Sequence, residues 1–169
     1  MSTEINPAVN IEKTEEQKAP SAPNRLKRVK LIVAYDGTNY HGWQVQPNGE
    51  TIEGVLNRTL SSLLGEKIVV TGASRTDAGV HSMGNVAVFD TNSRIPAEKI
   101  SYALNQRLPK DIVVVKSDEV DLNWHPRYQD TLKTYEYHII NTKVPIPTER
   151  LYNYFVPQQS ELLGGGDFI

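Results

Sequence analysis

Apolar residues along this chain alternate with other positions in short stretches, and two longer stretches show helical spacing. Residues 29–35 are apolar on both faces of an extended chain, which predicts a strand in the middle of a sheet. Apolar positions then recur at helical intervals from Ile52 to Leu64, and Gly65 is expected to end that helix. Residues 67–72 and 85–90 predict two further strands.

A second helix is predicted to begin at Pro96, because proline is tolerated in a first helical turn. Its buried stripe is expected to reach Leu108, and Pro109 is expected to end it. A valine-rich strand over 111–116 follows. The resulting order β-α-β-β-α-β predicts an α+β fold of the ferredoxin-like type, with two helices on one face of an antiparallel sheet.

An extra strand is predicted over 133–140, after an irregular stretch. Tyr135, Tyr137 and Ile139 alternate there with polar residues, which is typical of a half-buried strand. At the other end, residues 1–24 carry few large apolar groups and several Pro, Glu and Lys, which predicts a disordered tail.

Composition excludes several kinds of chemistry. The chain has no cysteine, so disulfides, thiolate catalysis and cysteine-ligated metals are excluded. Its four histidines lack the spacing of a metal-binding pair, so no metal is expected. No apolar run has the length of a membrane span and no secretory signal is evident, so we expect no membrane partner and a cytoplasmic location.

The net charge of −2 neither requires nor excludes a nucleic acid partner. A basic stretch, Arg25 to Lys30, leads into the first predicted strand. It is either a solvated strand edge or a contact for phosphate groups.

Chemistry is indicated most clearly between residues 74 and 82, which read Ser-Arg-Thr-Asp-Ala-Gly-Val-His-Ser. Asp77 enters a small glycine-containing turn between two predicted strands, and functional groups are often carried on such loops. Arg75 would favour the ionised form of a neighbouring carboxylate. Asp77 is therefore a candidate nucleophile or base. The alternative is that it only stabilises a turn.

Three separated motifs together resemble the N-terminal half of the tRNA pseudouridine synthase A family. They are Tyr-Asp-Gly-Thr with Gly-Trp-Gln-x-Gln over 35–46, Arg-Thr-Asp-Ala-Gly-Val-His over 75–81, and Lys-Thr-Tyr-Glu-Tyr over 133–137. The resemblance runs from about residue 27 to 155. It implies that 25–156 form the N-terminal ferredoxin-like domain with a following strand, and that 157–169 begin a truncated second half.

The resemblance also implies a reaction, the cofactor-free isomerisation of uridine to pseudouridine at positions 38–40 of the tRNA anticodon arm. Asp77 would be the nucleophile, attacking either C6 of the base or C1′ of the sugar. Tyr135 would lie against the target base, which must leave its stack. Arg75 would pair with Asp77 and help to hold the flipped nucleotide.

Weaker expectations attach to other residues. Gln44 and Gln46 lie on a loop that in the family touches tRNA, although a plain surface loop explains them equally well. Arg127 is expected to contact RNA or the aspartate. Trp43 is expected to pack inside the protein, and His81 to bond to backbone.

The resemblance further implies a homodimer in the full-length family. Because the second half is missing here, the alternative function is a catalytically incomplete remnant that binds RNA or dimerises. A ferredoxin-like regulatory module that binds a small ligand is a third possibility. Tritium release from tRNA would separate an enzyme from a remnant, and an absence of tRNA binding at low salt would favour the module.

Overall fold

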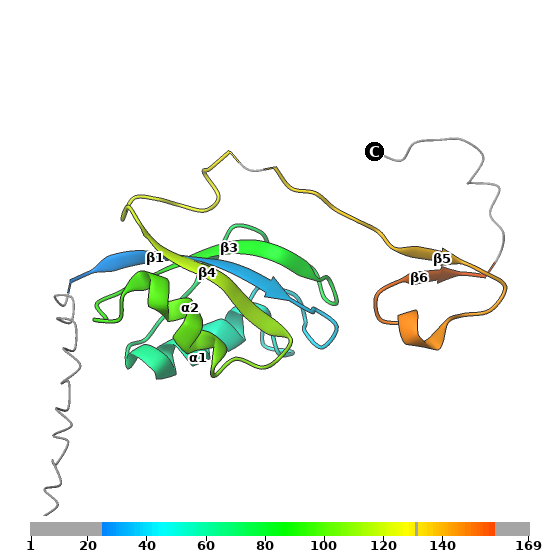
Figure 1. Cartoon of the computed structure of the whole chain (residues 1–169), viewed down its shortest axis with the longest axis horizontal. Coiled ribbons are helices and arrows are strands. Elements are labelled where there is room, and N and C mark those ends of the chain that lie inside the picture. Colours follow the sequence, from blue (N-terminus) through cyan, green and yellow to red (C-terminus); the bar gives the residue numbers. More distant parts are fainter. Residues whose placement is uncertain (1–24, 131, 158–169) are drawn as a thin grey trace, which may run out of the picture.

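The computed structural model describes residues 25–130 and 132–157 (Figure 1). The predicted disordered tail, 1–24, and all but the first residue of 157–169 lie outside this description. The elements, in chain order, are β1 (Lys27–Tyr35), α1 (Ile52–Leu64), β2 (Thr71–Gly72), β3 (Ser82–Thr91), α2 (Ala97–Asn105), β4 (Ile112–Val120), β5 (Ile139–Asn141), the 3-10 helix η1 (Pro147–Glu149) and β6 (Tyr154–Val156).

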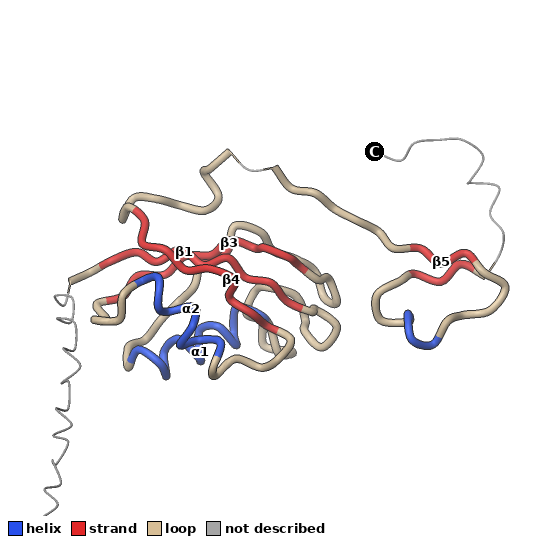
Figure 2. Tube along the Cα trace, viewed as in Figure 1, coloured by secondary structure: helices blue, strands red, loops and turns tan. Residues whose placement is uncertain are grey.

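The main sheet has the strand order β2-β3-β1-β4, and every neighbouring pair is antiparallel. β1 is central, as its two apolar faces predicted. Figure 2 shows both α-helices on the same side of this sheet. β5 and β6 form a separate, parallel two-stranded sheet. The prediction of an α+β fold with an antiparallel sheet is confirmed.

The core lies between the helices and one face of β1. Val29, Leu31 and Val33 are fully buried on that face. They share one cluster with buried residues of α1 and α2, among them Leu56 and Leu104. At about 25 cal/mol per Å² of apolar area, this burial drives the helices onto the sheet. The opposite face of β1 is half-buried.

Both ends of α1 follow the sequence pattern. The Thr51 hydroxyl accepts a hydrogen bond from the Gly54 N–H at 3.2 Å, which satisfies an otherwise free donor of the first turn. Gly65 has φ +68° and its N–H donates to the Ser61 carbonyl, which ends the helix as predicted.

The strand predicted over 67–72 is wrong for four of its six residues, because only Thr71 and Gly72 pair with β3. Ile68 and Val70 are buried, but their N–H groups donate to side chains of α1, the Ser61 hydroxyl at 2.9 Å and the Asn57 carboxamide at 2.8 Å. These side-chain acceptors replace a neighbouring strand.

The boundaries of α2 also differ from the prediction. Pro96 is the residue before the first helical turn, not inside it, and the helix ends at Asn105. Leu108 still packs against the core from the following turn.

The extra strand predicted over 133–140 is likewise mostly absent, since β5 begins at Ile139. The alternating tyrosines there are exposed, Tyr135 by 68% and Tyr137 by 85%. Within 25–130 and 132–157 they have no partner strand, and alternation alone cannot supply one. We call residues 132–157, which include β5, η1 and β6, the arm.

No helix in the described part of the chain is long and apolar enough to cross a bilayer.

Candidate active site

Asp77 lies on the loop that joins β2 to β3, which we call the Asp77 loop (residues 73–81). Its first half is extended, so successive side chains point to opposite sides. Ser74 and Thr76 face the protein and are half-buried, whereas Arg75 and Asp77 are exposed. The arginine and the aspartate of the motif are therefore presented together on the solvent side. An exposed carboxylate is accessible to an extruded base.

The expected ion pair between Arg75 and Asp77 is not formed. Among the described residues, neither side chain has an ion-pair or hydrogen-bond partner within the protein. Both charged groups point into solvent, where water screens their attraction and side-chain entropy opposes a fixed pairing. They are free to bind another molecule.

The Asp77 loop is held against the loop that follows β1. The Trp43 N–H donates to the Thr76 carbonyl at 3.0 Å, and the Gly79 N–H donates to the Tyr40 carbonyl at 3.2 Å. Gly42 has φ +82°, and a Cβ there would lie 2.6 Å from the Thr76 carbonyl oxygen. The Trp43 side chain is buried, as predicted. The two loops are thus joined by backbone hydrogen bonds and close packing.

Asp36, at the end of β1, is the most strongly perturbed acid beside this loop. Its carboxylate accepts from the Thr38 hydroxyl at 2.6 Å and the Thr38 N–H at 3.0 Å. These bonds favour the ionised form and lower the pKa of Asp36 to about 2. Tyr152, from the arm, also donates its hydroxyl to Asp36 at 2.8 Å. Burial opposes the lowering but is outweighed.

His81 also contacts Asp36. Its Nδ1 accepts a hydrogen bond from the Gly37 N–H at 3.1 Å, which confirms that it bonds to backbone. The same nitrogen lies 3.1 Å from an Asp36 carboxylate oxygen. A neutral ring can accept from Gly37, whereas a ring protonated at Nδ1 would instead pair with Asp36. The Tyr152 ring packs on the His81 ring, with centroids 5.4 Å apart.

The arm therefore contacts the Asp77 loop through Tyr152, a residue that the sequence reasoning missed. No periodic pattern marks Tyr152, because it follows a 3-10 turn rather than a regular element. Tyr135 lies on the extended start of the arm. Within 25–130 and 132–157 no hydrogen bond or ring contact joins it to the Asp77 loop, so the structure does not bring these two predicted residues together.

The weaker candidates fall in two places. Gln44 and Gln46 are exposed on the loop after β1, and the Gln46 amide donates to the His41 carbonyl. Arg127 reaches β2, where its Nε donates to the Gly72 carbonyl at 3.0 Å. That carbonyl is five residues before Asp77, so Arg127 contacts the base of the loop rather than the carboxylate.

The basic stretch at the start of β1 has protein partners. Arg25 pairs with Glu119, and Arg28 with Asp90. The Lys27 ammonium donates to a backbone carbonyl, and Lys30 lies near Asp118 and the Trp124 ring. These contacts favour a structural role for the stretch over phosphate binding.

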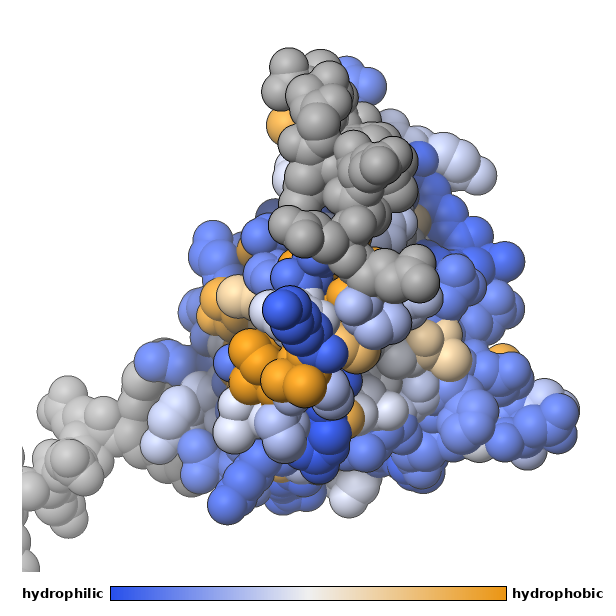
Figure 3. All heavy atoms as spheres, turned by 90° about the vertical axis from the view of Figure 1, so that its right-hand side faces the viewer, coloured by the Kyte–Doolittle hydropathy of each residue, from blue (hydrophilic) through white to orange (hydrophobic). Residues whose placement is uncertain are grey.

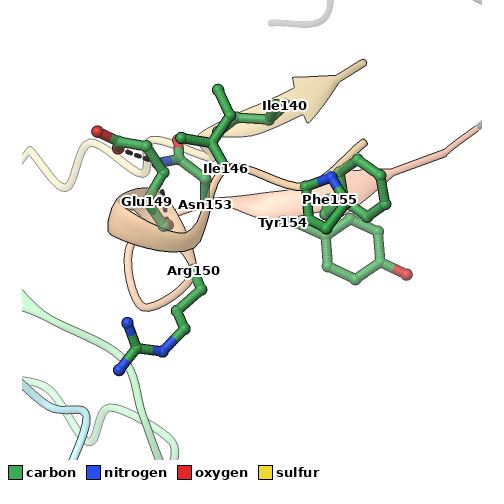
Figure 4. Close-up of a pocket in the computed structure, with 8 residues that line it drawn as sticks. Ile140, Ile146, Glu149, Arg150, Asn153, Tyr154 and Phe155 are labelled. Carbon is green, nitrogen blue, oxygen red and sulfur yellow. Dashed lines mark hydrogen bonds between the residues drawn. The ribbon is translucent and has the colours of Figure 1, made fainter. Parts of the chain in front are cut away.

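Apolar side chains gather on the arm side of the molecule, as the orange spheres in Figure 3 show. A hollow of about 300 Å³ also lies within the arm, and in Figure 4 Arg150 points away from its aromatic side chains. The hollow is lined by Ile140, Pro145, Ile146, Glu149, Arg150, Asn153, Tyr154 and Phe155. None of these residues belongs to the Asp77 loop, so the hollow is separate from the candidate active site.

Among the described residues, no group of three or more His, Asp or Glu side chains is placed to hold a metal ion.

Comparison with known families shows which family this chain belongs to. A family model described as "tRNA pseudouridine synthase" matches residues 31–129, which include the Asp77 loop, Asp36 and Arg127. The chain belongs to the tRNA pseudouridine synthase family. The match ends before the arm, so Tyr135 and Tyr152 lie outside it.

Individual proteins that are similar to this chain carry names that agree with the family. A tRNA pseudouridine synthase A of Acetivibrio thermocellus is 50% identical over 131 residues, which are 78% of this chain and 54% of the relative. One of Ruminiclostridium cellulolyticum is 51% identical over 117 residues, 69% of this chain and 48% of the relative. A "tRNA pseudouridine synthase A 2" of Clostridium perfringens is 44% identical over 137 residues, 81% of this chain and 56% of the relative. The chain spans about half the length of the relatives it matches.

Proposed function

We propose that this chain is the N-terminal part of a tRNA pseudouridine synthase and converts uridine to pseudouridine in the anticodon arm of tRNA. The observation that carries the proposal is the outward presentation of Asp77 and Arg75 on a loop held at both ends, in a member of this family. Asp77 is the nucleophile, and its exposure leaves room for a base that has left its stack.

Arg75 and Tyr135 bind the substrate in this proposal. Neither the guanidinium nor the Asp77 carboxylate is engaged within the described protein, which supports a contact with the nucleotide instead. Tyr135 offers an exposed aromatic ring and a hydroxyl, and no strand within 25–130 and 132–157 pairs with its segment, so the ring can approach a bound base. Gln44, Gln46 and Arg127 serve as further RNA contacts. The enzyme uses no cofactor.

The proposal also covers the assembly of the protein, its location and its type of fold. The exposed apolar side chains of the arm support association with a second copy, which would make the protein a homodimer. Action on tRNA supports a cytoplasmic location. The element order and the strand order β2-β3-β1-β4 support the ferredoxin-like description of the domain that we propose over 25–156.

The test measures tritium release from tRNA that carries uridine labelled at C5, since C5 loses its hydrogen when the new C–C bond forms. We expect release by the wild-type chain and none by Asp77→Asn, which keeps the size of the side chain but removes the charge. Asp130→Asn, at an exposed aspartate outside the Asp77 loop, is the matched control and retains activity.

Binding of tRNA is measured in parallel at low salt, where phosphate contacts are strongest. A folded wild-type chain that binds tRNA without releasing tritium would contradict the proposed catalysis and favour the incomplete remnant. Equal release by the wild type and Asp77→Asn would contradict the role of Asp77.

A further inference from the structure

The Asn85 side chain continues the hydrogen bonding of the sheet after β2 has ended. The last backbone bond at this point joins the Ala73 N–H to the Val86 carbonyl at 2.7 Å. For the next residue, Ser74, the partner is the Asn85 carboxamide. Its Nδ2 donates to the Ser74 carbonyl at 3.0 Å, and its Oδ1 accepts from the Ser74 N–H at 3.3 Å.

Two residues further on, Thr76 is held by Tyr35. The Tyr35 hydroxyl lies 2.8 Å from the Thr76 hydroxyl, and the Asn85 Nδ2 lies 3.5 Å from the same tyrosine oxygen. Tyr35 and Asn85 are both buried, at 5% and 6% exposure. One buried polar group of two side chains therefore bonds to both inward-facing residues of the extended segment, Ser74 and Thr76.

Because side chains of an extended segment alternate, fixing Ser74 and Thr76 inward also fixes the direction of their neighbours. Arg75 and Asp77 are directed outward by the bonds of the residues beside them. Catalytic groups need such support, since a displacement of about 1 Å can cost ~100-fold in rate.

We propose that Asn85 and Tyr35 are positioning residues that set the placement of the Asp77 carboxylate for attack on the substrate. This inference rests on the proposed function. Neither residue touches the substrate. Their side-chain hydrogen bonds reach Ser74 and Thr76 of the Asp77 loop, and they also bond to each other.

Ser117 provides a matched control on β4. It is also a buried polar residue, at 2% exposure, and its hydroxyl donates to the Ala97 carbonyl at 2.6 Å and accepts from the Ser101 N–H at 2.8 Å. Its partners lie on α2 and not on the Asp77 loop. Ser117→Ala therefore removes as many hydrogen bonds to backbone as Asn85→Ala does, at a site that does not support Asp77.

The experiment compares Asn85→Ala, Tyr35→Phe and Ser117→Ala in the full chain, by kcat, tRNA Kd and hydrogen exchange of the Ser74 amide. We expect both Asn85→Ala and Tyr35→Phe to lower kcat at least about tenfold, or ~1.4 kcal/mol in the barrier, with tRNA Kd within about twofold. Exchange of the Ser74 amide should accelerate about tenfold or more in Asn85→Ala, because a protected N–H loses its acceptor. In Ser117→Ala, kcat, the tRNA Kd and the exchange rate of the Ser74 amide should all stay within about twofold of the wild-type values.

Different results would refute the positioning role and the proposed function. If Asn85→Ala and Tyr35→Phe keep kcat within about twofold of Ser117→Ala, the positioning role is overturned. If the wild-type chain releases no tritium, the proposed function fails, and the exchange measurement alone decides whether Asn85 holds the Ser74 backbone. Unaltered exchange of the Ser74 amide in Asn85→Ala would overturn that contact. Tyr35→Phe removes a single oxygen, so it keeps the kinetic test available if Asn85→Ala does not fold.

Discussion

Replacement of Gly72 by alanine tests how tightly the base of the Asp77 loop is packed. Gly72 is a buried residue of β2, and a Cβ there would lie 2.5 Å from Nε1 and 2.6 Å from Cε2 of Trp43. Real side chains do not approach so closely, and the Trp43 ring cannot retreat easily because it is only 1% exposed and contacts the Tyr35 ring. Gly72→Ala must therefore displace the indole, the strand, or both.

The size of the effect follows from two opposing contributions. Overpacking a core usually costs about 1–3 kcal/mol. Against that, replacing glycine restricts the unfolded chain and stabilises the protein by about 0.4–1 kcal/mol. The centres of these ranges leave a net loss of about 1.3 kcal/mol in the free energy of unfolding. Urea unfolding followed by far-UV circular dichroism and by tryptophan fluorescence measures it, since Trp43 itself reports on the site.

Gly84→Ala is the control because it makes the same chemical change on the adjoining strand. A Cβ at Gly84 in β3 would have its nearest neighbour, the Ile32 Cγ2 atom, at 3.6 Å, which is ordinary van der Waals contact. We expect Gly84→Ala to be neutral or slightly stabilising. An equal loss in both variants would mean that alanine is disfavoured in these strands for reasons other than packing.

A double-mutant cycle with Trp43→Leu makes the reasoning refutable. The smaller side chain removes the indole atoms that the new Cβ would meet, so Gly72→Ala should cost at least about 1 kcal/mol less in that background. The same cost of Gly72→Ala in both backgrounds would show that the clash with Trp43 is not the cause.

Three further predictions concern stability. Thr51→Ala should lower the free energy of unfolding by about 1 kcal/mol through loss of the cap on the Gly54 N–H, whereas Thr51→Ser should restore most of it; thermal unfolding of the pair measures this. Gly65→Ala should cost about 1 kcal/mol or more at φ +68°, although no atom lies within 4 Å of the new Cβ, and a loss near zero would contradict the strain argument. The pKa of Asp36 is lowered from 3.8 to about 2, so the ionised carboxylate stabilises the folded state. This contribution is complete above pH 4 and is lost as the pH falls toward 2. Between pH 5 and 2 the free energy of unfolding should therefore fall by about 1–2 kcal/mol more in the wild type than in Asp36→Asn. This amount is reduced because the carboxylate is one-third exposed to solvent. Parallel profiles of stability against pH for the two proteins would refute the prediction.

The sequence pattern was sufficient where a single element determines its own structure. Both helices, the central position of β1 and the end of α1 at Gly65 follow from local spacing and from one residue with positive φ. The motif around Asp77 was also visible, because its residues are contiguous. Its outward presentation agrees with the alternation of an extended chain.

The pattern failed where a strand needs a partner that lies elsewhere in the chain. Residues 67–70 have the composition of a strand, yet two side chains of α1 take their N–H groups. The tyrosines of 133–137 alternate in the same way, and no strand pairs with them in the described part of the chain. Alternation predicts an extended conformation, but hydrogen bonds to a second segment are required for a sheet.

Local spacing and residue type by themselves determined the class of fold and the helices, since those depend on neighbours a few positions apart. The likeness of three separated motifs to a family is what singled out Asp77 as the candidate nucleophile. Only the tertiary structure decided what holds Asp77. Asn85 and Tyr35 reach Ser74 and Thr76 from other strands, and Tyr152 reaches Asp36 across 116 positions of sequence. Such contacts depend on how the strands and loops meet in space, because a side-chain hydrogen bond forms only when donor and acceptor come within about 3 Å.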